Sequence, residues 1–251
     1  MLNKLLKLTP RLQCVAGFID KGATVADIGT DHGLLPVYLV LKKLALNVIA
    51  SDISGNSLSS AIRNAELYGV SKLITFVRAA GLDDISDGDA DTIVIAGVGG
   101  ETIVNILDRA PWTRNRNVRC VLQPQSKLGE LCYWLADNGY IISDAELTCD
   151  KGRYYCVVLV IWEGQNNDSG KATDSASAGI AFPHSIASCE SGLYTLLVRK
   201  CDPLAEPFFD VQLHKINRAL RGIEHSNRHP PDYLKNMHAK ITCLKEECKK
   251  W

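Results

Sequence analysis

Short apolar runs alternate with amphipathic stretches along the first two thirds of the chain. The runs have the length of buried strands, and the stretches between them repeat apolar residues at helical spacing. Such alternation predicts parallel β-α-β units with helices on both faces of a sheet. We expect strands over 23–28, 47–52, 74–77, 92–96, 119–123, 141–147 and 154–162, the last two joined as a hairpin at 150–152, with helices between the strands and one that begins at Pro10.

Apolar residues return at heptad spacing near the end of the chain. Two segments carry this pattern, and the sequence His229-Pro230-Pro231-Asp232 separates them. Heptad seams on two neighbouring segments predict an antiparallel, coiled-coil-like helical hairpin. Each segment has fewer than four heptads, so simple packing on the body is the alternative. The seam residues are Phe209, Leu213, Ile216, Leu220 and Ile223 in the first segment, and Leu234, Met237, Ile241, Leu244 and Cys248 in the second.

Residues 164–192 separate these two regions and are rich in Gly, Ser, Ala, Asn and Asp. Few large apolar residues occur there, which indicates a flexible linker or insertion. The predicted organisation is therefore a Rossmann-like α/β domain with a mostly parallel sheet over 1–163, the insertion over 164–192, and a basic C-terminal helical hairpin over 193–251.

Composition places the chain among ordinary globular proteins, with 46% hydrophobic and 22% charged residues. No apolar run reaches the roughly 20 residues that a membrane span needs. The N-terminus is interrupted by Lys4, Lys7 and Pro10 and does not resemble a signal peptide, so we expect a cytoplasmic protein that contacts no membrane. The 9 cysteines are scattered without a Cys-x-x-Cys pair. This spacing predicts free thiols and no metal site.

Charge is unevenly distributed, although the net charge is +0. Residues 1–195 carry 17 Lys+Arg and 21 Asp+Glu, whereas residues 196–251 carry 11 and 7. A basic end on an acidic body suggests an anionic partner. Charge alone, however, favours an ordinary solvated helical surface.

Two acids and two glycines mark the turn after the first strand, in the pattern Asp27-x-Gly29-x-Asp31-x-Gly33. Glycines let such a turn tighten and let the backbone approach a ligand. The dinucleotide-binding pattern at this place carries glycines without acids, because it must cradle a pyrophosphate. Acids repel phosphate but suit a cation, such as the amino group of a methionine moiety. The turn therefore favours S-adenosylmethionine over NAD.

Further candidate residues follow the next strands. Asp52 ends the second strand about 20 residues after the glycine turn, where an acid can accept hydrogen bonds from ribose hydroxyls. A turn-capping role is the alternative for Asp52. Three glycines follow the fourth strand, at the edge where open α/β sheets bind ligands. The predicted cofactor-binding residues are Asp27, Gly29, Asp31, Gly33, Asp52, Ile53, Gly81, Gly97 and Val98.

Several of these motifs together resemble one family. The stretch Val25–His32, the stretch Thr92–Gly100 and the sequence Leu122-Gln123-Pro124 are similar to the bacterial tRNA (adenine-22 N1)-methyltransferases. The opening 8–12 and the turn 151–155 fit as well, and the resemblance covers Leu8 to about Gly164 and resumes near Leu193. The chain departs from the family at Ala80, where a polar residue is usual.

The resemblance implies methyl transfer from S-adenosylmethionine to N1 of adenine 22 in the D-stem of tRNA. The base must then leave the stem, because N1 lies on the paired edge. Asp31, His32 and Gln123 are the catalytic candidates, with a structural role in the cofactor loop as their alternative. We expect a monomer, or at most a weak dimer, that binds tRNA. The residues expected to contact tRNA phosphates are Arg11, Lys235, Lys240, Lys245 and Lys249.

Three other functions stay open on the sequence. The first is an S-adenosylmethionine-dependent methyltransferase for another RNA, a protein or a small molecule, which the basic hairpin disfavours. The second is a non-catalytic RNA-binding protein with a degenerate cofactor fold, which the presence of Asp27, Asp31, Gly33 and Asp52 disfavours. The third is an NAD-dependent oxidoreductase, which the acidic turn disfavours.

Overall fold

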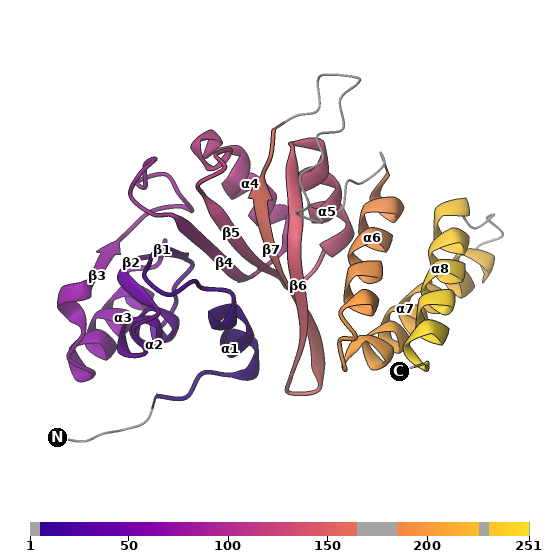
Figure 1. Ribbon diagram of the computed structural model, residues 1–251, viewed down its shortest axis with the longest axis horizontal. Coiled ribbons are helices and arrows are strands. Elements are labelled where there is room, and N and C mark those ends of the chain that lie inside the picture. The colour runs from indigo at the N-terminus through magenta and orange to yellow at the C-terminus, as the bar shows by residue number, and fades with distance from the viewer. Residues whose placement is uncertain (1–5, 165–184, 226–230, 251) are drawn as a thin grey trace.

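The computed structural model describes residues 6–164, 185–225 and 231–250. A seven-stranded sheet with strand order β3-β2-β1-β4-β5-β7-β6 forms its centre (Figure 1). β1 to β5 run parallel, and β7 and β6 are added as an antiparallel hairpin. The strands are β1 (Ala23–Ile28), β2 (Ala45–Ser51), β3 (Ile74–Val77), β4 (Thr92–Val98), β5 (Arg119–Pro124), β6 (Tyr140–Asp150) and β7 (Arg153–Trp162).

Helices cover both faces of the sheet, as the sequence pattern predicts. Two short 3₁₀ turns, η1 (Ser71–Leu73) and η2 (Pro111–Thr113), occur in the connections. The predicted α/β fold with a mostly parallel sheet is confirmed, and its strands match the predicted ranges within a few residues. The helices are α1 (Pro10–Gly17), α2 (Leu34–Leu41), α3 (Gly55–Leu67), α4 (Gly100–Asp108), α5 (Leu128–Asp137), α6 (Ile186–Arg199), α7 (Ala205–His225) and α8 (Asp232–Cys248).

Alternating strand residues bury into two separate cores. In β1, Val25 packs with α1 and α2, while Ala26 and Ile28 pack with the residues of α4 and α5. The same alternation places Val94 of β4 in the first core and Ile93 in the second. Successive strand side chains point to opposite faces, so near-continuous apolar strands are what a sheet covered on both faces requires.

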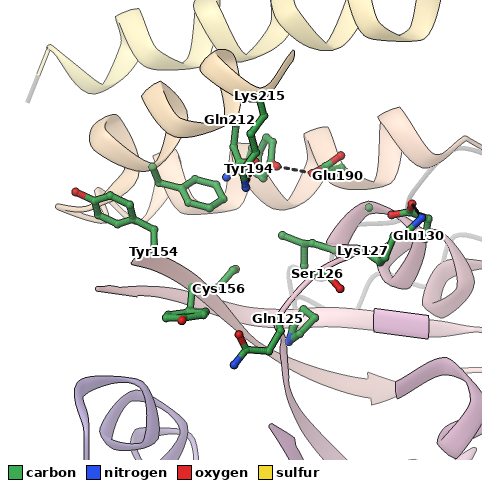
Figure 2. Close-up of a pocket in the computed structure, with 15 residues that line it drawn as sticks. Gln125, Ser126, Lys127, Glu130, Tyr154, Cys156, Glu190, Tyr194, Gln212 and Lys215 are labelled. Carbon is green, nitrogen blue, oxygen red and sulfur yellow. Dashed lines mark hydrogen bonds and ion pairs between the residues drawn. The ribbon is translucent and has the colours of Figure 1, made fainter. Parts of the chain in front are cut away.

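The second core continues from the sheet into the C-terminal helices. Tyr194 of α6 lies edge-on to Phe208 and Phe209 of α7, and Met237 and Ile241 of α8 belong to the same buried cluster. The Tyr194 hydroxyl donates a hydrogen bond to Glu190 one helical turn earlier (Figure 2). Most of the predicted heptad residues of α7 and α8 therefore supply core contacts, namely Phe209, Leu213, Ile216, Met237, Ile241, Leu244 and Cys248. The helix α6 packs between them and the sheet, and because it begins at Ile186, the predicted insertion over 164–192 is wrong for its last residues. Residues 165–184 of that prediction lie outside the described residues.

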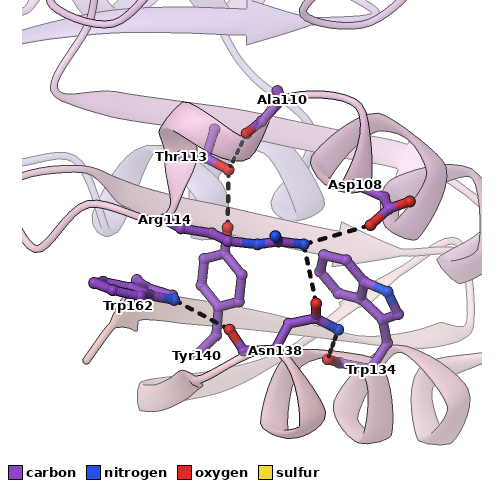
Figure 3. A network of polar contacts seen from close by, with 8 residues as sticks. All are labelled: Asp108, Ala110, Thr113, Arg114, Trp134, Asn138, Tyr140 and Trp162. Carbon is purple, nitrogen blue, oxygen red and sulfur yellow. Dashed lines mark hydrogen bonds and ion pairs between the residues drawn. The ribbon is translucent and has the colours of Figure 1, made fainter. Parts of the chain in front are cut away.

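A network of polar contacts lies at the end of the sheet where β5 begins and β7 ends (Figure 3). The buried Tyr140 hydroxyl lies 2.8 Å from the Thr113 hydroxyl, and burial raises the pKa of Tyr140 to about 12. The Arg114 guanidinium donates to the Asn138 side chain, and the Trp162 ring nitrogen donates to the Asn138 carbonyl. These hydrogen bonds join the connections at this end of the sheet to one another, although the buried Arg114 Nε has no partner among the described residues.

Asp202 joins the C-terminal helices to the sheet. One of its carboxylate oxygens accepts the backbone N–H of Leu147 in β6 at 2.8 Å, and the other accepts that of Leu204 before α7 at 2.9 Å. The neighbouring Lys200 pairs with Asp144 of β6. Among the described residues, no helix has both the length and the apolarity that crossing a membrane requires.

The substitution Asp202→Ala tests this junction. We expect it to lower the free energy of unfolding by about 2 kcal/mol, because it leaves the buried Leu147 N–H without an acceptor. Urea denaturation of the full chain measures the change. The matched control is Asp137→Ala at the exposed end of α5, which should shift stability by no more than about 0.5 kcal/mol. Equal stability of the two variants would contradict the role of Asp202.

Candidate functional site

The carboxyl ends of β1, β2, β4 and β5 lie side by side. The register pairs Ile28 with Ser51 on one side and with Ile95 on the other, and Ile95 in turn with Leu122. From β1 the strand order runs to one side through β2 and β3, and to the other side through β4 and β5. Open α/β sheets bind ligands at such a switch in strand order, here between β1 and β4. The predicted residues after each strand are therefore brought to one edge.

The turn after β1 winds around the end of β2. The backbone N–H groups of Gly29 and Thr30 both donate to the Ser51 carbonyl, at 2.8 and 3.0 Å. Gly29 has a φ of 74°, and Asp31 a φ of 52°, in the left-handed region that Asp tolerates better than most residues. This conformation directs the Asp31 side chain outward, where it is 71% exposed beside His32, with the His32 Nε2 3.7 Å from an Asp31 oxygen.

Gly33 has a packing reason to be glycine. A Cβ there would lie 2.6 Å from the Cβ of Ala61 in α3, and its φ is 67°. Gly33 thus lets α2 begin against α3 and holds the turn in place.

Asp27 is a buried acid at the end of β1, with only 5% of its surface exposed. Burial raises the pKa of Asp27 to about 6, and the nearby Asp52 adds to the rise, while Thr30 and Arg11 oppose it. The Thr30 hydroxyl is also buried and has no hydrogen-bond partner within the described part of the chain. A carboxylate and a hydroxyl that burial leaves poorly satisfied fit a polar, cationic ligand group.

Asp52 fixes the turn and keeps capacity for a ligand. One oxygen accepts the Asp31 N–H at 3.0 Å, and the other accepts the Ser54 N–H at 2.8 Å. Each carboxylate oxygen has a further lone pair that can accept a hydroxyl. Ile53 beside it is 70% exposed, an apolar surface fit for a flat ring. The Gly81 carbonyl meets the Ser51 hydroxyl at 3.4 Å, which links the segment after β3 to the end of β2.

The buried Gln123 at the end of β5 holds Arg11. Its side-chain oxygen accepts the Arg11 guanidinium at 2.8 Å, and its amide nitrogen donates to the Pro124 carbonyl at 2.9 Å. The amide therefore has partners within the protein. A Cβ on Gly97 would lie 3.1 Å from the same guanidinium, so Gly97 makes room for Arg11 across the end of β4.

The sequence analysis expected Arg11 to contact tRNA phosphates and missed this contact with the end of β5. Thr9 and Pro10 start α1 and so place Arg11 in its first turn, where the helix dipole disfavours a cation. A cation at such a position needs an external partner, which is the signal that could have directed attention to it.

The four lysines expected to contact tRNA lie on α8 or, for Lys249, directly after it, far from the cofactor turn (Figure 1). Lys245 pairs with Asp210 of α7, and Lys249 pairs with Glu246. Lys235 and Lys240 are exposed and form no ion pair with the described residues. Within the same residues, no group of three or more His, Cys, Asp or Glu side chains could hold a metal ion.

Comparisons with known proteins agree with this geometry. Residues 8–158 match a family model described as a methyltransferase domain. The tRNA (adenine(22)-N(1))-methyltransferase of Bacillus subtilis is 36% identical over 175 residues, which are 70% of this chain and 73% of that protein.

Two solved structures extend the similarity to nearly the whole chain. The B. subtilis m1A22 tRNA methyltransferase TrmK has a TM-score of 0.72 at 28% identity and covers 98% of both chains. Streptococcus pneumoniae Sp1610 in complex with S-adenosyl-L-methionine has a TM-score of 0.74 at 26% identity, with 95% of this chain and 100% of that chain covered. The chain belongs to the family of tRNA (adenine-22 N1)-methyltransferases.

Proposed function

We propose that this protein transfers the methyl group of S-adenosylmethionine to N1 of adenine 22 in the D-stem of tRNA. The observation that carries the proposal is the pair of acids at the ends of β1 and β2, the buried Asp27 and the turn-binding Asp52, in a chain that belongs to this family. When bound, the cofactor supplies an electrophilic methyl group: the N1 lone pair forms the new N–C bond while the C–S bond breaks and its electron pair stays on sulfur.

The residues that would hold the cofactor follow from their contacts. Asp27 and the Thr30 hydroxyl would receive the amino group of the methionine moiety, and the Arg11 guanidinium would pair with its carboxylate. Asp52 would accept the ribose hydroxyls, and Ile53 would pack on the adenine ring. In this arrangement Gln123 is a positioning residue for Arg11, rather than a contact to the target base.

Asp31 and His32 are proposed to face the target base. Both side chains are exposed at the edge that holds the cofactor turn. The methyl group carries positive charge onto the base, and a carboxylate beside it stabilises that charge or accepts a proton from the exocyclic amine. N1 needs no strong base before attack, so alignment of the two reactants is the main requirement.

The tRNA is proposed to extend from this edge over α8, with Lys235 and Lys240 as free cations for its phosphates. We place the protein in the cytoplasm, which agrees with its free cysteines, including the exposed Cys201 and Cys243. We propose a monomer as the working form.

Nucleoside mass spectrometry tests the reaction. After incubation of tRNA with the protein and labelled S-adenosylmethionine, we expect labelled 1-methyladenosine. A tRNA with guanosine in place of adenine 22 should yield none. Labelled product at another position or on another class of substrate would contradict the assignment.

The pH dependence of cofactor affinity tests Asp27. A ligand ammonium group needs the ionised carboxylate, and the pKa of Asp27 in the free protein is about 6. We therefore expect affinity to be highest near pH 7, where the carboxylate is ionised and an α-amino group is still protonated, and to weaken by up to about tenfold per pH unit below 6. Calorimetric titration measures it. Asp27→Asn should bind weakly with a flat profile, and a flat profile in the wild type would contradict the role.

Lowering the pH is expected to weaken cofactor binding but to stabilise the folded, cofactor-free protein. Because the pKa of Asp27 is raised above its ordinary 3.8, the free folded protein takes up this proton more readily than the unfolded chain. Its contribution therefore makes the cofactor-free protein more stable as the pH falls from 7 towards 4. Asp27→Asn should remove this contribution and stabilise the free protein at pH 7, as thermal unfolding can show.

The double variant Lys235→Ala, Lys240→Ala tests the tRNA surface. Loss of two phosphate contacts should weaken tRNA binding several-fold and lower the slope of log affinity against log salt by about two. Cofactor affinity should not change, because α8 is distant from the turn. Lys72→Ala on η1 is the control with an exposed lysine elsewhere. Unchanged tRNA affinity in the double variant would place the RNA on another face.

A further inference from the structure

A cavity of about 250 Å³ lies between the loop after β5, the start of β7, and helices α6 and α7 (Figure 2). Gln125 and Ser126 form its wall on the sheet side, and Tyr154 of β7 stands at one end. Phe208, Gln212 and Lys215 line the side that α7 contributes. The proposed function assigns no role to any of these side chains.

This cavity shares a wall with the glycine turn at the end of β4. The Gly100 N–H donates to the Ser126 carbonyl at 2.9 Å, and the Gln125 N–H donates to the Val98 carbonyl at 2.8 Å. A Cβ on Gly99 would lie 3.3 Å from the Ser126 hydroxyl. The cavity is thus adjacent to the proposed methyl-transfer edge, with the loop 125–127 between them.

The walls suit a neutral, flat ring with polar edges. Tyr154 is half-buried and offers a ring, and the exposed Gln125 amide forms no side-chain hydrogen bond within the described ranges. Gln amides donate and accept at once and read base edges in pairs. Aromatic side chains stack on any base.

The cavity lining has no surplus of positive charge that would attract an anion. Glu130 lines the cavity and pairs with Lys127 at 3.1 Å. Glu190 lies deeper in the cavity, where burial raises the pKa of its carboxyl group. The Tyr194 hydroxyl donates a hydrogen bond to that carboxyl group. Lys127 and Lys215 also line the cavity, so its two carboxyl groups are balanced by two lysines and no surplus of positive charge is left for a phosphate. The carboxyl oxygens can accept hydrogen bonds from an exocyclic amine. The base of a nucleotide therefore fits the interior better than its phosphate.

We propose that this cavity holds the base of a nucleotide that flanks adenine 22, stacked on Tyr154 and hydrogen-bonded to Gln125. The proposal rests on the proposed function. Extracting the target base from the stem unstacks its neighbour, and that costs free energy which a second base site recovers. The loop 125–127 keeps this second base apart from the one that is methylated.

The variants Tyr154→Ala and Gln125→Ala test the site in the full chain. Loss of a stacking contact should raise the KM for tRNA about tenfold with little change in kcat, because the contact is the same before and during reaction. Tyr154→Phe should stay near the wild type. Gln125→Ala, at an exposed position, keeps the test valid if Tyr154→Ala is unstable. Tyr133→Ala, exposed on α5, is the matched control.

Fluorescence of 2-aminopurine locates the base. The probe is placed in tRNA at adenine 22 or at either flanking nucleotide, and binding is followed without turnover. We expect quenching at a flanking position that is lost in Tyr154→Ala and kept in Tyr154→Phe. Tyr154-dependent quenching at position 22 alone would make this the target-base pocket and overturn the proposal, as would no effect of either alanine variant.

The same measurements separate the two proposals. A wild type that methylates adenine 22 while both alanine variants match it retains the proposed function and overturns the flanking-base site. A wild type that neither binds nor methylates tRNA overturns both.

Discussion

The parallel register of β1, β2, β4 and β5 is the constraint on which the rest of the molecule depends. It aligns Ile28 with Ser51 and Ile95, so the turns that follow these strands must crowd one edge. Hydrogen bonds then tie neighbouring turns together, as where Asp52 accepts the Asp31 N–H. A strand slip by one residue would exchange the two faces and scatter these groups. The pair of acids at the ends of β1 and β2 is a result of the sheet, rather than of any single loop.

The C-terminal helices are joined to this sheet by a shared core and by Asp202. Phe208 and Met237 belong to the same buried cluster as the strand residues Ile95 and Leu122. A basic helix that packs in this way keeps a fixed position relative to the strand ends. The surface proposed for RNA and the strand ends proposed for chemistry are therefore joined through one core.

Periodicity predicted most of the fold because burial on two faces leaves a local signal. β1 and β3 occupy the predicted residues, and the glycines of the first turn adopt the positive φ that their pattern suggests. Contacts between distant residues leave no such signal. Gln123 was predicted as a catalytic candidate, whereas its bond to Arg11 could not be read from the sequence, and neither could the contact of Ala61 that requires glycine at Gly33. The ends of strands can be predicted from the sequence. Which side chain from another element lies across them, here Arg11 of α1, depends on how the elements pack.

The contact between Arg11 and Gln123 joins residues 112 positions apart. Contacts of such long range form late in folding, because the entropy lost on closing a long loop is offset only once much of the chain is ordered. A growing chain that has completed only β1 to β4 would carry both glycine turns without the anchor that orients the guanidinium. Orientation of the Arg11 guanidinium at the strand ends is therefore coupled to completion of the sheet, since β5 supplies Gln123.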